Sequence, residues 1–432
     1  MDYNENVQML KEKETMWNRN FIMVVLGQII SLFGNAILRF ALPLYLLNET
    51  GSAGLFGIVS ACAFIPMIVL SPIGGILADR VNKRNIMVVL DFTTAFLVLS
   101  VILLLGKINL VVLLLCALFF LYGINGAYQP TVQASIPVLL EGEHIMQGNA
   151  VINLVNSFAG LIGPVVGGAL FGFYGIMPIL YVSAACFILS AVMEIFIQIP
   201  YQKKAANGNI FAIGFGDLKE SFHYMYKKQP VIIHLSFAIA VINMILSALM
   251  IIGLPVIVMQ MLDFDTQTAN RLYGFAQGAM AMGSLCGGMG AGLFAKKLKT
   301  NNGYLILLFD ALTLIPIGLT IMLPIPAMIS YGIILVSCFV MMFLATVFSI
   351  QIMSCLQTIV PSNLIGKVIS CALCIGMSAS PIGQAIYGGL FELLDKMVFL
   401  LFFIAAALTV IFALSLKKTF EKLDNLIKTG LL

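Results

Sequence analysis

Charged residues are scarce in this chain of 432 residues: only 10% are Asp, Glu, Lys or Arg, against about a quarter in a typical soluble protein. Apolar residues make up 61% of the chain, and the mean hydropathy is +1.05. A water-soluble fold of this length could not bury so much apolar surface, so the composition predicts a protein that has lipid as its solvent. The net charge of +4 is too small and too scattered to indicate a nucleic-acid partner.

Several motifs of enzymes are also absent. The chain has no G-x-x-x-x-G-K-[ST] loop for ATP, no H-E-x-x-H pair and no G-x-S-x-G elbow, so we expect no ATPase, protease or esterase activity. The eight cysteines lie almost all inside apolar runs, and their spacing resembles no zinc site. We therefore expect no metal and no cofactor.

Long apolar runs dominate what is present. A helix that spans a bilayer needs roughly 20 apolar residues, and by that measure the sequence predicts twelve spans. They are 20–47, 52–77, 85–105, 109–134, 148–172, 175–199, 231–260, 272–295, 303–323, 326–352, 366–391 and 396–416. The predicted fold class is thus an all-α polytopic membrane protein.

The distribution of Lys and Arg predicts the orientation. If the N-terminus is cytoplasmic, nineteen of the 23 Lys and Arg residues lie in inner segments; only Lys107, Arg271 and Lys396 lie in outer loops, and Arg39 lies within a span. This bias follows the positive-inside rule. We expect both termini in the cytoplasm, which requires an even number of spans.

The two halves of the chain repeat one another. The third span of each half begins with a similar run that ends in an acid, NIMVVLD at 85–91 and YLILLFD at 304–310. QASIP at 133–137 recurs as QTIVP at 357–361. Repeats of this kind are typical of transporters. The expected domains are an N-terminal six-helix half (1–200), a cytoplasmic linker (201–230) and a C-terminal six-helix half (231–432).

One loop carries a family motif. The segment GGILADRVNKR at 74–84 resembles the G-x-x-x-D-R-x-G-R/K-R/K loop of the major facilitator superfamily, and this resemblance covers nearly the whole chain. It implies a gating loop in which Gly75 permits close helix packing, Asp79 forms a latch, and Arg80, Lys83 and Arg84 supply charge. The departure is Asn82 in place of glycine, for which we expect a left-handed turn.

A second motif lies in the fifth span. AGLIGPVVGG at 159–168 resembles the exporter signature G-x-x-x-G-P-x-x-G-G of the same superfamily, through Gly163, Pro164, Gly167 and Gly168. Shorter pieces, RFALPLY at 39–45 and VPSNLIGKV at 360–368, resemble its macrolide-efflux-like and multidrug exporter branch. The arginine that is usual in the fourth span is absent. The alternative for the glycines is an ordinary packing face.

Ionisable residues within the spans are the candidates for ion coupling, because a charge in hydrocarbon is costly. They are Arg39, Asp91, Glu194 and Asp310. Arg39 and Asp91 lie at different depths, so we expect each to act through a cavity and not as one salt bridge. The alternative for the acids is solvation in an inner vestibule.

Polar stripes on several spans suggest a polar-lined path between the halves. Gln28, Ser31, Asn35 and Arg39 follow one helical face. The cavity candidates are Gln28, Asn35, Asn125, Gln129, Asn153 and Asn243. Each stripe alone could instead serve hydrogen bonds between helices.

These features predict a secondary active transporter that exports small hydrophobic or amphipathic compounds, drug- or macrolide-like, by alternating access. We expect H+ as the coupling ion, a monomer, and a multi-pass location in the plasma membrane. The alternatives are a nutrient importer of the same superfamily, a lipid flippase or a non-transporting membrane scaffold.

Overall fold

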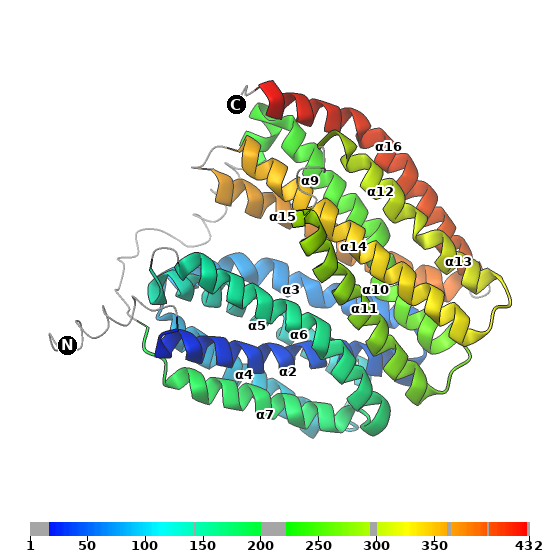
Figure 1. Ribbon diagram of the computed structural model, residues 1–432. Coiled ribbons are helices and arrows are strands. Elements are labelled where there is room, and N and C mark those ends of the chain that lie inside the picture. The colour runs from blue at the N-terminus through cyan, green and yellow to red at the C-terminus, as the bar shows by residue number, and fades with distance from the viewer. Residues whose placement is uncertain are drawn as a thin grey trace. The chain divides into compact units, whose positions relative to one another are not determined.

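The computed structural model describes residues 17–141, 144–199, 222–293, 300–360, 364–394 and 397–429. Nearly all of these residues are helical, and short turns join the helices (Figure 1). In the described part of the chain, each predicted apolar run lies for most of its length in a helix or in a series of continuous helical segments. Ten helices in the described part are long and apolar enough to cross a membrane. That twelve helices cross it, with both termini in the cytoplasm, stays a prediction.

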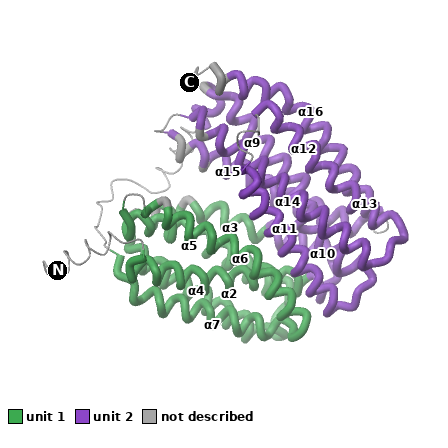
Figure 2. Tube along the Cα trace, in the orientation of Figure 1, with its two compact units in different colours: residues 1–46, 62–211 green, residues 47–61, 212–432 purple. Residues whose placement is uncertain are grey.

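Two compact units divide the chain, one of residues 1–46 and 62–211 and the other of residues 47–61 and 212–432 (Figure 2). We call them unit 1 and unit 2. The predicted domain boundaries stay a prediction, and residues 201–221 of the predicted linker lie outside the described part.

The first six helices each correspond to one predicted span. They are α2 (Arg19–Thr50), α3 (Ala53–Arg80), α4 (Lys83–Leu104), α5 (Leu110–Leu139), α6 (His144–Tyr174) and α7 (Ile176–Ile195).

The later helices are less regular. The seventh predicted span consists of α9 (Pro230–Ile242), η2 (Asn243–Ser247), α10 (Ala248–Val256) and η3 (Ile257–Met261), in which η2 and η3 are π-helical turns. A short π-helical turn, η1 (Tyr224–Lys228), precedes it. The others are α11 (Thr266–Leu293), η4 (Thr300–Asn302), α12 (Gly303–Leu312), α13 (Leu314–Met322), α14 (Ala327–Ile359), α15 (Ile365–Leu394) and α16 (Phe399–Thr429).

Asparagines begin two of the helices in unit 1. The Asn82 side chain accepts a hydrogen bond from the Arg84 amide at the start of α4, and Asn109 accepts from the amides of Val111 and Val112 at the start of α5. Such caps satisfy amides that a helix leaves without a partner. The left-handed turn expected at Asn82 is wrong, because its φ is −59°. Asparagine serves there as a helix cap.

Apolar side chains cover the outside of the helices, and polar ones lie within. Phe96, Leu293 and Leu393 are 72%, 82% and 81% exposed. By contrast, the buried polar residues include Gln28, Asp91, Glu194 and Asp310. This reverses the pattern of a soluble protein, and it is what hydrocarbon solvent requires.

Glycine contacts recur in the two repeats. In unit 1, Gly74 and Gly126 let α3 and α5 approach so closely that a Cβ on either would meet backbone atoms of the other helix. In unit 2, Gly283 and Gly287 do the same for α11 and α14. Likewise, α4 packs on α7, while α12 and α13 pack on α16. The second and fourth helices of each half, and the third and sixth, are thus paired in the same way.

The turn between α2 and α3 belongs to unit 2, although it is continuous with unit 1 at both ends. We call residues 47–61 the α2–α3 corner. Its Asn48 donates to Asn270 Oδ1 at 3.0 Å, and its Ser52 donates to Glu392 Oε1 at 3.0 Å. Gln260 Nε2 donates to the Gly51 carbonyl, also at 3.0 Å. Three polar contacts therefore hold the corner to helical segments of the C-terminal half of the chain.

Candidate functional site

A buried group of polar side chains connects four helices of unit 1. Ser31 Oγ on α2 donates to Asp91 Oδ1 on α4 at 2.9 Å. Tyr128 Oη on α5 donates to Glu194 Oε1 on α7 at 2.6 Å. Asp91 and Glu194 are each only 2% exposed, and Ser31, Asp91 and Tyr128 line one small cavity. We call these four residues the carboxylate cluster.

Small residues place Glu194 beside α2. Gly27 has no side chain, and a Cβ there would lie 3.5 Å from Glu194 Cγ and from Ser190 Oγ. Ser190 Oγ donates to the Gly27 carbonyl at 3.0 Å. About two helical turns further along the same contact, Ser183 Oγ donates to the Gly34 carbonyl at 3.3 Å. Small and hydroxyl residues are the usual means by which membrane helices pack closely. The α2–α7 contact therefore brings the Glu194 carboxyl into the interior of the unit.

Several polar atoms around the cluster have no partner. Asp91 Oδ2, Glu194 Oε2 and both amide atoms of Gln28 are buried without a hydrogen bond. Gln28 is 1% exposed and lies one helical turn before Ser31 on α2. An unmet buried polar group costs about 1–3 kcal/mol, and more if it is charged. Four such atoms in unit 1, two of them on the carboxyl groups of the cluster, indicate a site that serves something other than stability.

A cavity of about 10 Å³ adjoins the cluster, which is about the room that one water molecule needs. Its polar lining comes from Ser31, Asn35, Asp91, Thr94, Asn125 and Tyr128. The interior of unit 1 is therefore polar at this level.

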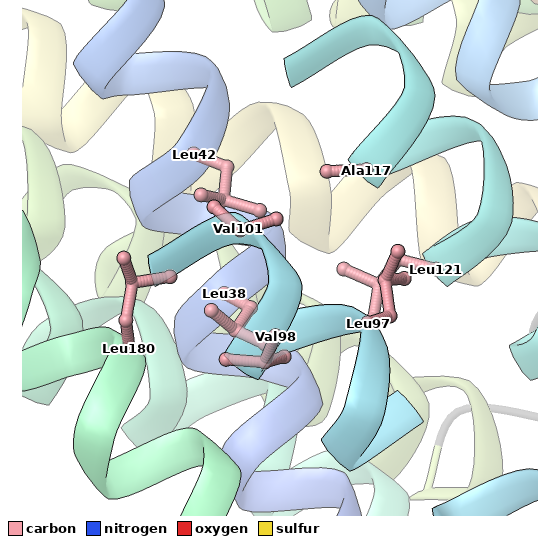
Figure 3. Close-up of a pocket in the computed structure, with 8 residues that line it drawn as sticks. All are labelled: Leu38, Leu42, Leu97, Val98, Val101, Ala117, Leu121 and Leu180. Atoms are coloured by element: carbon pink, nitrogen blue, oxygen red, sulfur yellow. The ribbon is translucent and has the colours of Figure 1, made fainter. Parts of the chain in front are cut away.

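A second cavity among the same four helices has a wholly apolar lining. Figure 3 shows this small cavity, into which side chains from α2, α4, α5 and α7 converge. Its lining is Leu38, Leu42, Leu97, Val98, Val101, Ala117, Leu121 and Leu180. On α2 this apolar lining begins seven residues beyond Ser31, toward the end at Thr50.

Arg39 has an aromatic partner. Its guanidinium carbon lies 3.9 Å from the centre of the Tyr122 ring, and Phe64 packs edge-on to that ring with centroids 5.1 Å apart. A cation–π contact of this kind contributes about 0.5–2 kcal/mol to stability. The structure thus places Arg39 over Tyr122, while the hydrogen-bond partner of Asp91 is Ser31.

Asp310 occupies in unit 2 the sequence position that Asp91 occupies in unit 1. It lies near the end of α12, is 1% exposed, and its Oδ1 has no hydrogen-bond partner. Thr313 Oγ1 donates to the Asp310 carbonyl at 2.6 Å, at the junction between α12 and α13. Asp310 therefore belongs to a separate candidate site.

The predicted gating loop is described only in part. Gly75 and Asp79 lie in the last turns of α3, and the side chain of Asp79 lies outside the described part of the structure. Arg84 contacts the C-terminal end of α7 by donating to the Ile195 carbonyl at 3.5 Å. Arg80 and Lys83 each have partners.

The glycines of the predicted exporter motif form the contact between α6 and α2. A Cβ at Gly163 would overlap Ala36, and one at Gly167 would lie 3.1 Å from the Phe40 ring. Pro164 lies within α6, and Gly168 is buried there. The motif therefore has a packing role in this structure.

The cavity candidates separate into two groups. Asn35 and Asn125 line the cavity beside Asp91 and Tyr128. Gln28 is buried one turn before Ser31, and Gln129, which follows Tyr128 on α5, has a buried Nε2 without a partner. Asn153 is exposed on α6. Asn243 donates to the Gly376 carbonyl at 3.0 Å and joins α15 to the π-helical turn η2.

Sequence reasoning singled out both acids but missed Tyr128, which lies between them. The available signal was its spacing: Tyr128 follows Asn125 by three residues and so shares its helical face. Its partner on α7 is 66 residues away, and only the folded chain shows that pairing.

The sequence profile of the Major Facilitator Superfamily matches residues 24–384. Because this match covers most of the chain, the protein belongs to that superfamily, and it is a transporter. The resemblance seen in the loop motif is thereby confirmed.

Named relatives match over part of the chain. Macrolide efflux protein A of Streptococcus pyogenes is 25% identical over 190 residues, which are 44% of this chain and 47% of that protein. Multidrug resistance protein MdtG of Serratia proteamaculans is 27% identical over 197 residues, again 44% of this chain and 47% of that protein. The chain thus spans about half the length of the curated relatives that it matches.

Solved structures resemble the whole chain. The nucleoside transporter NupG has a TM-score of 0.73 at 11% identity, covering 93% of this chain and 99% of that one. The peptide transporter POT in complex with sulfate has a TM-score of 0.73 at 14% identity, covering 94% and 95%. At this identity the likeness establishes the fold alone.

Proposed function

We propose that this protein exports small hydrophobic or amphipathic compounds, drug- or macrolide-like, by alternating access driven by the proton gradient. The observation that carries the proposal is the buried pair of acids, Asp91 and Glu194, which lack a cationic partner among the described residues. In a membrane interior such acids mark ion pathways and proton relays. The names of the partial relatives, macrolide efflux and multidrug resistance, support the direction and the class of substrate.

The other candidates for proton coupling are Arg39 and Asp310. The Arg39 guanidinium lies over the Tyr122 ring, and one carboxyl oxygen of Asp310 has no hydrogen-bond partner. The protein works as a monomer in the plasma membrane. It needs no nucleotide, since the gradient supplies the free energy.

Export can be tested in inverted membrane vesicles. Vesicles with the protein should accumulate a fluorescent amphipathic dye when a pH gradient, acid inside, is imposed, and they should lose the dye when the gradient is collapsed. A deletion strain should become more susceptible to macrolides. Uptake of a nutrient into whole cells, with no dye transport in vesicles, would contradict export and favour the importer.

The gating loop supplies a first prediction. Asp79→Asn should reduce the transport rate strongly while leaving the amount of folded protein near normal. One charge at a solvated helix end contributes little to stability, but it biases an equilibrium between two conformations. Transport by Asp79→Asn vesicles, normalised to protein content, measures the effect, and a normal rate would show that this residue forms no latch.

The α2–α3 corner supplies a second prediction. The corner continues into unit 1 at both ends. When the transporter changes the side of the membrane to which its substrate site opens, we expect the corner to move with unit 1 and to lose its contacts with the rest of unit 2. Linking Asn48→Cys to Asn270→Cys with a short bis-maleimide, in a background without native cysteines, should therefore reduce transport to the background rate.

The matched control links two helices of unit 2 that we expect to stay in contact throughout the transport cycle. Thr346 Oγ1 donates to Ser284 Oγ at 2.9 Å between α14 and α11, so Ser284→Cys/Thr346→Cys should tolerate the same reagent. Full transport after complete linkage of residues 48 and 270 would show that the corner stays bound throughout the cycle.

A further inference from the structure

We propose that Asp91 and Glu194 form a single proton-binding dyad inside unit 1, and that Ser31 and Tyr128 position its two carboxyl groups. This inference rests on the proposed proton-driven function, and it identifies where the proton binds. The site lies within the interior of one six-helix unit, on α2, α4, α5 and α7.

The hydrogen bonds define the dyad. Each carboxyl accepts one hydroxyl hydrogen through one of its oxygens: Asp91 Oδ1 from Ser31 and Glu194 Oε1 from Tyr128. The second oxygen of each carboxyl is buried and accepts no hydrogen bond. Ser190, which lies beside Asp91, donates its hydroxyl hydrogen to the Gly27 carbonyl instead. With both groups ionised, two negative charges would lie close together in a low-dielectric interior, which is unfavourable. A proton on either carboxyl removes one charge and supplies a donor hydrogen.

The surroundings contain few other groups that could neutralise the pair. Beside Asp91 lie Ser31 of α2 and Ser190 of α7, which do not titrate. Tyr128 of α5 donates to Glu194. Cys186 on α7 packs against Gly34 of α2. The described cations on α2 beyond Ser31 and at the start of α4 have other partners: Arg39 lies over Tyr122, and Arg84 contacts Asn85 and the Ile195 carbonyl. Charge compensation therefore falls to a proton.

The adjoining cavity favours a proton over a metal cation. It holds about 10 Å³, which is room for one water, and the two hydroxyl groups direct hydrogens, not lone pairs, at the carboxyl oxygens. Gln28, with both amide atoms unmet and 1% of its surface exposed, lies beside Gly27, which faces Glu194. An amide both donates and accepts, so the Gln28 side chain suits a partner in either protonation state.

Infrared difference spectroscopy of the purified full-length protein tests the dyad without any transport. A carboxylic acid has a C=O stretching band that a carboxylate lacks. Titration of the wild type should show a band that disappears with rising pH and is missing from Asp91→Asn/Glu194→Gln. Asp310→Asn should retain that band, because Asp310 lies in unit 2.

Tyr128→Phe tests the positioning role and remains informative if the double variant folds poorly. The Tyr128 hydroxyl donates to the Glu194 carboxyl, so its removal should shift the pH midpoint of the band. Tyr181→Phe is the matched control, because Tyr181 lies on α7 but is 56% exposed. In Tyr181→Phe, the pH at which half of the carboxylic-acid band has disappeared should equal that of the wild type.

Three results would overturn the dyad. They are an identical pH-dependent band in wild type and double variant, an unchanged midpoint in Tyr128→Phe, or the same band change when sodium replaces potassium at constant pH. Failure of export with a normal band titration would contradict the proposed function and leave the dyad intact. Proton-driven export without a dyad band would place coupling elsewhere.

Discussion

Gly163→Leu is expected to cause the largest loss of stability among single substitutions in α6. A Cβ at Gly163 would overlap Ala36 of α2, and a leucine adds three more carbon atoms. Inserting bulk into a packed interface costs about 1–3 kcal/mol, and more where backbone cannot move away. The midpoint of thermal unfolding in detergent should fall markedly, and the fraction of monodisperse protein should fall with it.

The control is Gly160→Leu, one turn earlier on the same helix. A Cβ at Gly160 meets nothing within 4 Å, so this variant should unfold at nearly the wild-type temperature. Equal destabilisation by both substitutions would mean that the cost arises from helix backbone flexibility and not from the α6–α2 contact.

Asp91→Asn is expected to reduce gradient-driven export to the background rate while counterflow of the same substrate continues. Counterflow exchanges substrate for substrate and needs no net movement of protons, so it reports whether the protein still binds substrate and changes conformation. Asparagine keeps the size and the hydrogen bond to Ser31 but cannot take up a proton. Arg39→Ala should have a smaller effect, because it removes a contact with Tyr122 worth about 0.5–2 kcal/mol.

The measurement is dye transport in proteoliposomes with an imposed pH gradient, run beside counterflow at equal pH. Glu194→Gln should give the same separation between the two assays as Asp91→Asn. Full gradient-driven rates in the Asp91 and Arg39 variants would exclude both residues from coupling and leave them a purely structural role.

The helices were predictable because hydrophobicity alone determines them. A run of about 20 apolar residues must satisfy its backbone internally in lipid, and in the described part of the chain each predicted run is helical for most of its length. Asp91 and Glu194 were likewise conspicuous, since acids in such runs are rare.

Partners across the chain were not predictable in the same way. Periodicity shows which face of α5 is polar, but not that Tyr128 on that face bonds to Glu194, 66 residues later. Periodicity also predicted the same cavity role for Asn125 and Asn153, although Asn125 is buried and Asn153 is exposed. The conformation of Asn82 was predicted wrongly because asparagine both caps helices and tolerates left-handed turns. The choice between them depends on where α4 begins.

The apolar cavity in unit 1 interrupts the hydrogen-bonding groups of the interior. Its eight lining side chains carry no hydroxyl, amide or carboxyl group, so a hydrogen-bonded chain of donors cannot continue through them. A charge faces a steep energy barrier in such surroundings. At the same depth, the Arg39 guanidinium and the Tyr122 ring are in contact with one another. For the proposed proton binding at Asp91 and Glu194, we therefore expect entry and exit from the end of the unit where α2 begins, and little leak of protons toward the Thr50 end.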